Sequence, residues 1–199
     1  MYKGYRITKK YSEWMYHRVQ RAYRKGDFQR VAPKINMLFI STYRRVFAYF
    51  DGDEPVAWLA LDRRRNWKCW CVAQVYVQPE FRGQGIATKL YKVVVNDQRI
   101  VLATGISHTE YSMGLWRNFV KNKTFNIYAV DFKNLDLVAD VVVVDDMLHS
   151  TLDVYHPYTE KKDVRLIALR KENGIRRSNT RSSIAGRVRD RERSVHQHR

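Results

Sequence analysis

The most informative stretch of this sequence is VAQVYVQPEFRGQGIATKLY, residues 72–91. It has the pattern of a strand, a tight turn with two glycines, and the start of a helix. Main-chain N–H groups around Gly83 and Gly85 can point together at a phosphate, and the N-terminus of the following helix adds partial positive charge. Glycine also lets the backbone approach an anion closely, because it has no Cβ. The stretch therefore predicts an anion site at the end of a strand.

The longer string resembles the acetyl-CoA motif of the GNAT acyltransferase superfamily, V-x-P-x-x-R-G-x-G-[IV]-[AG]. Arg82, Gly85 and Ala87 match the core of that motif, and the resemblance extends over about residues 45–130. A nucleotide-triphosphate loop is the alternative, but no Gly-Lys-Ser/Thr follows the turn. The resemblance implies an α/β (α+β) GNAT fold, with a mixed, mostly antiparallel central sheet flanked by helices. It also implies acetyl-CoA or another acyl-CoA as co-substrate. We expect no metal, because the sequence has no Cys/His quartet with zinc spacing.

The resemblance assigns a binding role to two segments. The main chain of Val75 and Val77 would pair with the pantetheine arm and polarise the thioester carbonyl, stabilising the oxyanion that forms there. The reaction would be direct attack by an acceptor amine on the acyl-CoA, helped by proximity. The pyrophosphate would be bound by the amides of Arg82, Gly83, Gln84, Gly85, Ile86 and Ala87.

The sequence departs from the family pattern at both proton-transfer positions. Many members carry a carboxylate on the strand before the motif, where this chain has Gln74, which does not titrate. Many also place a tyrosine near the end of the next helix, where this chain has Val120. The sequence offers two substitutes after the fourth expected strand, His108 as a proton-transfer group and Tyr111 as a donor to the thiolate. The alternatives are a surface-loop histidine and a core aromatic.

The rest of the chain alternates strands and helices. Ser12 is expected to cap a helix that Gly26 ends, and 34–43 is ambiguous, read as a short helix or turn. A hairpin is expected over 45–50 and 55–61, because Asp51-Gly52-Asp53-Glu54 is typical of a turn. Further strands are expected at 67–77, 99–104, 125–130, 140–144 and 164–169, and helices at 88–96 and 110–121. We expect one domain over residues 1–170 and a basic, disordered tail over 171–199.

Positive charge is concentrated at the two ends of the chain. The net charge is +17, of which residues 1–45 hold 12 Lys/Arg against 2 Asp/Glu and residues 171–199 hold 9 against 3. Arg18, Arg21 and Lys25 recur at helical spacing as a basic stripe. Such asymmetry indicates an anionic partner, and the nearby aromatic residues suit stacking on unpaired bases. The alternative is a basic surface with no partner.

We therefore expect the N-terminal helix and the tail to bind nucleic acid, DNA or tRNA, that carries the acceptor amine. A modified DNA base, as in phage-type enzymes, and the amino acid of an aminoacyl-tRNA both fit. The alternatives are a protein lysine or N-terminus as acceptor, and a GNAT-fold protein that binds without catalysis.

Other features bound the class of protein. The sequence has no apolar run of about 18 residues, so a membrane span is not expected. No apolar segment follows the basic N-terminus, so we expect no secretory signal and a cytoplasmic protein. Cys69 and Cys71 lie two apart on an expected strand and favour burial over a disulfide. The oligomeric state cannot be read from the sequence.

Overall fold

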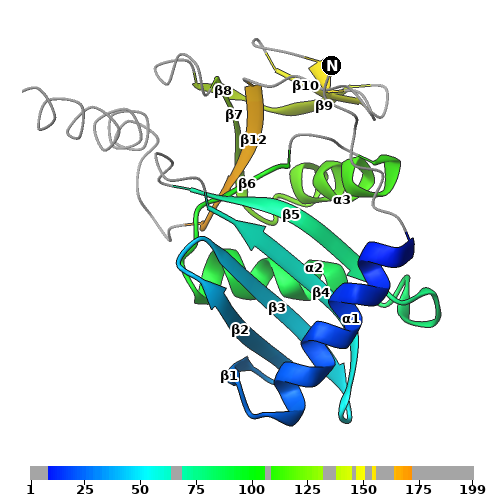
Figure 1. The fold of residues 1–199 in the computed structure, drawn as a ribbon. Helices are drawn as coiled ribbons and strands as arrows, with labels where there is room; N and C mark the ends of the chain where they lie inside the picture. The colour runs from blue at the N-terminus through cyan, green and yellow to red at the C-terminus, as the bar shows by residue number, and fades with distance from the viewer. Residues whose placement is uncertain are drawn as a thin grey trace, which may run out of the picture. The chain divides into compact units, whose positions relative to one another are not determined.

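The structure, a computed structural model, describes residues 9–63, 69–105, 109–131, 138–144, 147–150, 154–155 and 164–171. The chain separates into two compact units, Met1–Ser107 and His108–Arg199. Each unit has its own helices and strands (Figure 1). The expected tail lies outside the described residues except for Lys171, and the division into 1–170 and 171–199 stays a prediction.

The first unit is built around one sheet with the strand order β1-β2-β3-β4-β5-β6. Neighbours pair antiparallel except β5 and β6, which run parallel. The expected mixed, mostly antiparallel sheet is therefore confirmed. The strands are β1 (Phe28–Ala32), β2 (Ile35–Ser41), β3 (Arg44–Asp51), β4 (Glu54–Asp62), β5 (Trp70–Val77) and β6 (Leu102–Ala103).

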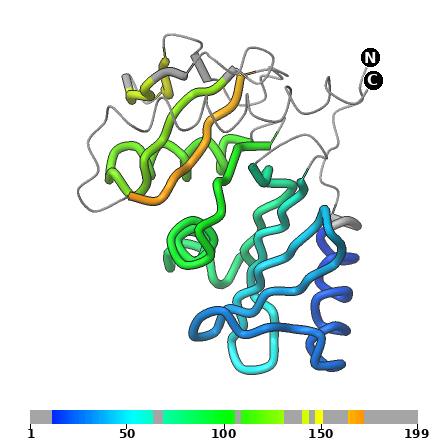
Figure 2. Tube along the Cα trace, turned by 90° about the vertical axis from the view of Figure 1, so that its left-hand side faces the viewer, coloured from blue at the N-terminus to red at the C-terminus, as the bar shows by residue number. Residues whose placement is uncertain are grey.

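Two helices cover opposite faces of this sheet, α1 (Lys9–Arg24) and α2 (Ile86–Lys92) (Figure 2). Alternate residues of a strand point to opposite faces. Val46, Ala48 and Phe50 of β3 therefore face α1, where they pack with the buried Met15 and Val19. The helical path of α2 continues as a π-helix, Val93–Asp97. Both helices thus exist because an apolar stripe meets an apolar sheet face.

The second unit contains α3 (Glu110–Lys121) and two small groups of strands. Met113, Trp116 and Phe119 recur at helical spacing in α3 and are buried. Strand β12 (Val164–Leu169) pairs antiparallel with β7 (Asn126–Asp131), which pairs with β8 (Val138–Asp140). A separate sheet has the order β11 (Val154–Tyr155), β10 (Met147–His149), β9 (Val142–Val144).

Three expectations were wrong in detail. Residues 34–43 contain strand β2 rather than a helix, because β3 and β1 pair with its two edges. Ser12 lies inside α1 rather than at its cap, and its Oγ accepts a hydrogen bond from Gln74 Nε2 at 3.2 Å. The expected strand 140–144 is divided between β8 and β9, which belong to different sheets. The first and third of these depend on strand pairing, which a local pattern does not report.

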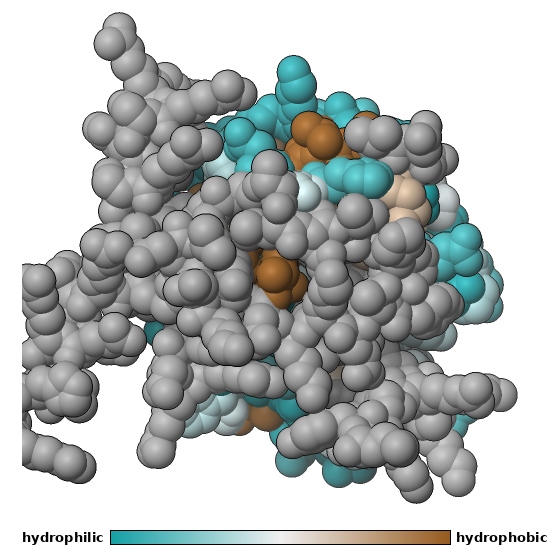
Figure 3. All heavy atoms as spheres, turned by 90° about the horizontal axis from the view of Figure 1, so that it is seen from above, coloured by the Kyte–Doolittle hydropathy of each residue, from teal (hydrophilic) through white to brown (hydrophobic). Residues whose placement is uncertain are grey.

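Two other expectations concern side chains and surfaces. Cys69 and Cys71 are buried and form no disulfide, as predicted. In the described part of the chain, no helix is long and apolar enough to cross a membrane. On the face in Figure 3, the described surface shows hydrophilic residues together with a few small apolar patches.

Candidate functional site

One edge of β5 is open over most of its length. Strand β6 pairs with β5 only at Trp70↔Leu102 and Cys71↔Ala103. From Val72 to Val77, no strand among the described residues lies on that side, while β4 pairs along the other side. The sheet is therefore divided where β5 runs towards the glycine turn, and one side of the β5 main chain has no described strand partner there.

The register of β4 and β5 shows which residues present their main chain at this open edge. The N–H of Gln78 donates to the Val56 carbonyl at 2.9 Å, so the polar groups of residue 78 point towards β4. Main-chain direction alternates along a strand. Tyr76 and Gln74 therefore also point towards β4, and Val75 and Val77 point towards the open edge. These are the two residues that the family resemblance assigns to pantetheine.

A row of main-chain donors follows the strand. A 3-10 turn, Pro79–Phe81, ends with Arg82 N–H bonded to the Pro79 carbonyl at 3.2 Å, and the first bond into α2 runs from Lys89 N–H to the Gly85 carbonyl. Between these two, within residues 69–105, the N–H groups of residues 83–88 donate to no protein acceptor. Six successive donors at a helix start are suited to an anion.

The two glycines make this row possible. Gly83 has φ 77° and Gly85 has φ 72°, the left-handed region that residues with a Cβ disfavour. A Cβ built on either glycine would meet no atom within 4 Å. The requirement for glycine is therefore conformational in the protein alone, and the space beside the loop is open to a ligand.

Two side chains of the loop form hydrogen bonds to main-chain carbonyls that precede it. Arg82 Nε donates to the Val77 carbonyl at 3.1 Å, and Gln84 Nε2 donates to the Glu80 carbonyl at 3.3 Å. The Arg82 bond agrees with the direction found for Val77, since that carbonyl points away from β4. The positive charge of Arg82 thus lies beside the junction of strand and loop.

Gln74 has a structural role on the α1 face of the sheet. Its side chain is 3% exposed, and its Oε1 accepts from Trp58 Nε1 at 3.1 Å. Its Nε2 donates to Ser12 Oγ, so the amide joins α1, β4 and β5. The aromatic ring of Tyr76 stacks on Trp58 at 4.5 Å, which favours packing over proton transfer for Tyr76. Sequence reasoning identified position 74 but not these partners.

The structure places Val75, Val77 and residues 82–87 in the first unit, at the end of β5 and in the loop that follows it, and their role in binding acyl-CoA stays a prediction. Tyr111 belongs to the second unit, on the first turn of α3, and is 50% exposed, so the alternative of a core aromatic is wrong. His108 lies outside the described residues. Thr88 was not predicted as a donor, although the first four N–H groups of any helix, here those of residues 85–88, lack a partner within it.

Comparison with known proteins places the chain in a family. The model of the acetyltransferase (GNAT) family matches residues 7–117, more than half of the chain. The chain therefore belongs to the GNAT acetyltransferase family, whose general activity is acyl-CoA-dependent N-acyl transfer with acetyl-CoA as acyl donor. Among curated proteins, no match was found.

Three solved structures show weaker similarity. An acetyltransferase of the GNAT family from Staphylococcus aureus Mu50 is 12% identical over 63% of this chain and 66% of that one, with a TM-score of 0.37. The IAA acetyltransferase from Bacillus cereus is 14% identical over 64% and 77%, with a TM-score of 0.36. A GNAT-family protein from Bacteroides thetaiotaomicron is 11% identical over 82% and 85%, with a TM-score of 0.38.

Proposed function

We propose that the N–H row of residues 83–88 binds the pyrophosphate of acyl-CoA, and that the open edge at Val75 and Val77 receives its pantetheine arm. The observation that carries this proposal is the set of six donors that have no acceptor within residues 69–105, and this set begins one turn after the open edge ends. An anion at this loop would satisfy the donors and meet the positive end of the helix. When bound, acyl-CoA supplies an activated thioester carbonyl for attack by an amine.

We propose further that the acceptor amine is carried on nucleic acid, either a modified DNA base or an aminoacyl-tRNA. The support is the charge distribution, with a near-neutral middle between two basic ends. Phosphates attract such clusters of lysine and arginine strongly. An amine on a protein is the second candidate, but the basic ends would favour an acidic protein target.

Proton transfer would use groups other than those common in the family. Gln74 is occupied by Trp58 and Ser12 and has no proton to exchange at neutral pH. We assign the exposed Tyr111 on α3 as the acid that protonates the leaving thiolate. We assign His108 as the base that takes a proton from the acceptor amine. The absence of a tyrosine at Val120 also favours a second candidate function, a protein that binds acyl-CoA and nucleic acid without turnover.

The test is thiol release from acetyl-CoA by the purified full chain, alone, with total tRNA, and with phage or host DNA. Release that requires one nucleic acid would support the proposal and identify the acceptor class. Release only with an acidic protein or peptide would favour the second acceptor. Acetyl-CoA binding without release under any of these conditions would favour the non-catalytic alternative, and no binding at all would overturn the loop assignment.

A further inference from the structure

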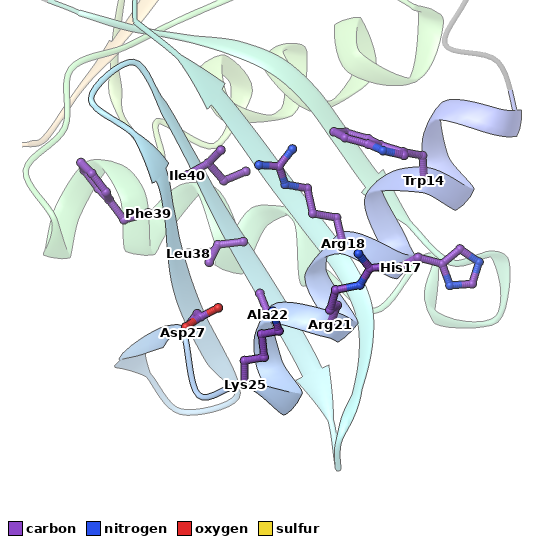
Figure 4. A pocket seen from close by; sticks show the side chains of 10 residues that line it. All are labelled: Trp14, His17, Arg18, Arg21, Ala22, Lys25, Asp27, Leu38, Phe39 and Ile40. Atoms are coloured by element: carbon purple, nitrogen blue, oxygen red, sulfur yellow. The ribbon is translucent and has the colours of Figure 1, made fainter.

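A groove of about 650 Å³ lies between α1 and the end of β2 in the first unit (Figure 4). Its floor is apolar, and a row of long cationic side chains borders it on the helix side. Strand β1 pairs with β2 only as far as Leu38, so no strand in the described part of the chain lies beside the edge of β2 beyond that residue, next to the groove. Its main lining residues are Trp14, Arg18, Arg21, Lys25, Leu38 and Ile40.

Helix periodicity sorts the residues of α1 into three stripes. Met15, Val19 and Ala22 form the buried stripe against the sheet. On one side of it, Tyr16 and Tyr23 reach the β3–β4 turn, where they donate to Glu54 and Asp53. The basic stripe runs along the other side and borders the groove. The acidic residues of that turn are therefore bonded on the opposite side of the helix from the groove.

The charge of the groove is unbalanced. The groove is lined by one carboxylate, Asp27, and by three cationic side chains, those of Arg18, Arg21 and Lys25. The ion pairs found among the described residues are Lys34–Asp51 and Arg44–Asp62, so these three cations are not neutralised by a salt bridge there. Cations held in a row by a helix, without carboxylate partners, attract a chain of negative charges.

An aromatic platform lies at one end of the row. Trp14 is 44% exposed, and the guanidinium carbon of Arg18 lies 5.2 Å from the centroid of its ring. In Figure 4, Arg18 extends across the groove towards Ile40, while His17 points away. A row of cations beside an exposed aromatic ring, above an apolar floor, is typical of sites that bind unpaired bases.

We propose that this groove binds a segment of single-stranded nucleic acid, with phosphates along Arg18, Arg21 and Lys25 and a base against Trp14. This inference rests on the proposed function, because it gives the nucleic-acid acceptor a site of contact. A duplex keeps its base faces stacked and cannot use Trp14. The chain's own segment 171–199 carries 9 Lys/Arg and 3 Asp/Glu, so it would be repelled by the groove. An acidic peptide would pair with the cations, but it would stack less favourably on Trp14 than a base does.

The experiment measures binding of a fluorescent single-stranded oligonucleotide to the full chain by anisotropy at several salt concentrations. The double variant Arg18→Glu/Arg21→Glu should lose at least about tenfold in affinity, and its salt slope should fall by about 1.4, because two phosphate contacts disappear. Trp14→Ala should weaken binding about five- to a hundredfold with the slope unchanged, because it removes stacking without charge.

The matched control is Arg24→Glu/Arg30→Glu, which makes the same change of charge at two exposed residues that do not line the groove. It should change affinity and slope less than the groove variant. Equal losses in both double variants, or full competition by polyglutamate together with no effect of Trp14→Ala, would overturn the proposal. Circular dichroism identifies any variant that fails to fold, and Trp14→Phe then serves as the milder stacking variant.

Acetyl-CoA binding, measured on the same samples, separates this proposal from the loop assignment. The groove variants should bind acetyl-CoA as the wild type does, and Gly85→Asp should bind the oligonucleotide as the wild type does. If neither the wild type nor any folded variant binds acetyl-CoA, the loop assignment is overturned. The oligonucleotide measurements would still test the groove.

Discussion

Arg82 Nε lies 3.1 Å from the carbonyl oxygen of Val77 and donates a hydrogen bond to it. The bond joins the last residue of β5 to the first residue of the glycine loop, and so fixes the open strand edge relative to the N–H row. A ligand that binds both the strand edge and the N–H row needs a fixed distance between them. Arg82 is therefore a positioning residue for the proposed acyl-CoA site, and its charge adds attraction for the pyrophosphate.

Replacing Arg82 should separate these two contributions. Arg82→Ala removes a charged hydrogen-bond donor and should weaken acetyl-CoA binding about tenfold or more, measured by calorimetry. Arg82→Lys keeps the charge but lacks Nε, and should recover only part of the loss. Full recovery with lysine would mean that charge alone matters and that the bond to Val77 does not position the loop.

The left-handed backbone at Gly85 gives a second prediction. Asparagine and aspartate both tolerate positive φ better than other residues with a Cβ, and they differ mainly in charge. Gly85→Asn should weaken acetyl-CoA binding modestly, and Gly85→Asp should weaken it at least about tenfold more, because a carboxylate faces the pyrophosphate. Gly52→Asn, at φ 61° in the β3–β4 turn, is the control for backbone strain and should leave binding unchanged. Equal binding by the Asn and Asp variants at position 85 would contradict the anion site.

Gln74 should matter for stability rather than for acetyl-CoA binding. Gln74→Leu leaves the indole N–H of Trp58 without its acceptor and should lower the free energy of unfolding by about 1–3 kcal/mol. Urea titration followed by tryptophan fluorescence measures this change. Gln78→Leu, which removes a less buried bond to the Pro55 carbonyl, should cost about 0.5–1.5 kcal/mol. A Gln74 variant as stable as the wild type would show that the bond joining α1, β4 and β5 contributes little.

Tyr111 should matter for turnover rather than for stability. Because half of its side chain is exposed, Tyr111→Phe should change the free energy of unfolding by no more than about 0.5 kcal/mol. If it protonates the thiolate, thiol release should fall about 10²- to 10⁴-fold with acetyl-CoA affinity unchanged. Tyr43→Phe, at a tyrosine of similar exposure in the first unit, is the control. An unchanged rate would remove Tyr111 from the reaction and leave His108→Gln as the next variant to measure.

The attachment of α1 to the β3–β4 turn should weaken at alkaline pH. Burial, with the nearby Glu54 carboxylate, raises the pKa of Tyr16, and the hydrogen bond to Asp53 raises the pKa of Tyr23. The folded protein therefore holds these protons at a pH where the unfolded chain, with a tyrosine pKa of about 10, has begun to lose them. Their stabilisation is complete below about pH 10 and is lost as the pH rises through the raised values.

Thermal unfolding at several pH values tests whether stability falls as the pH rises. The melting temperature should fall above about pH 10, and Tyr16→Phe/Tyr23→Phe should show a shallower fall, because phenylalanine has no proton to lose. A double variant with the same slope as the wild type would assign the alkaline loss to other groups.

Much of the first unit could be predicted from local patterns. The hairpin of β3 and β4, the buried stripe of α1 and the stop at Gly26 follow from turn residues and helical spacing within a few positions of one another. Strand β2 could not be predicted in this way, since its ambiguous pattern becomes a strand only by pairing with β1 and β3. Ser12 likewise has the residue type of a helix cap, but its partner, Gln74, is distant in sequence.

The glycine loop follows from the sequence alone, because the left-handed backbone at Gly83 and Gly85 and the start of α2 are properties of contiguous residues. The family and the basic stripe also follow from the sequence, since both depend on the spacing of residues that are close together in the chain. Three features required the folded chain: Val75 and Val77 face an open edge, Gln74 joins α1 to the sheet, and the basic stripe borders a groove. Each of these depends on where β4, β6 or β2 lies beside another element, and such long-range contacts are fixed by packing of the whole unit rather than by any single segment.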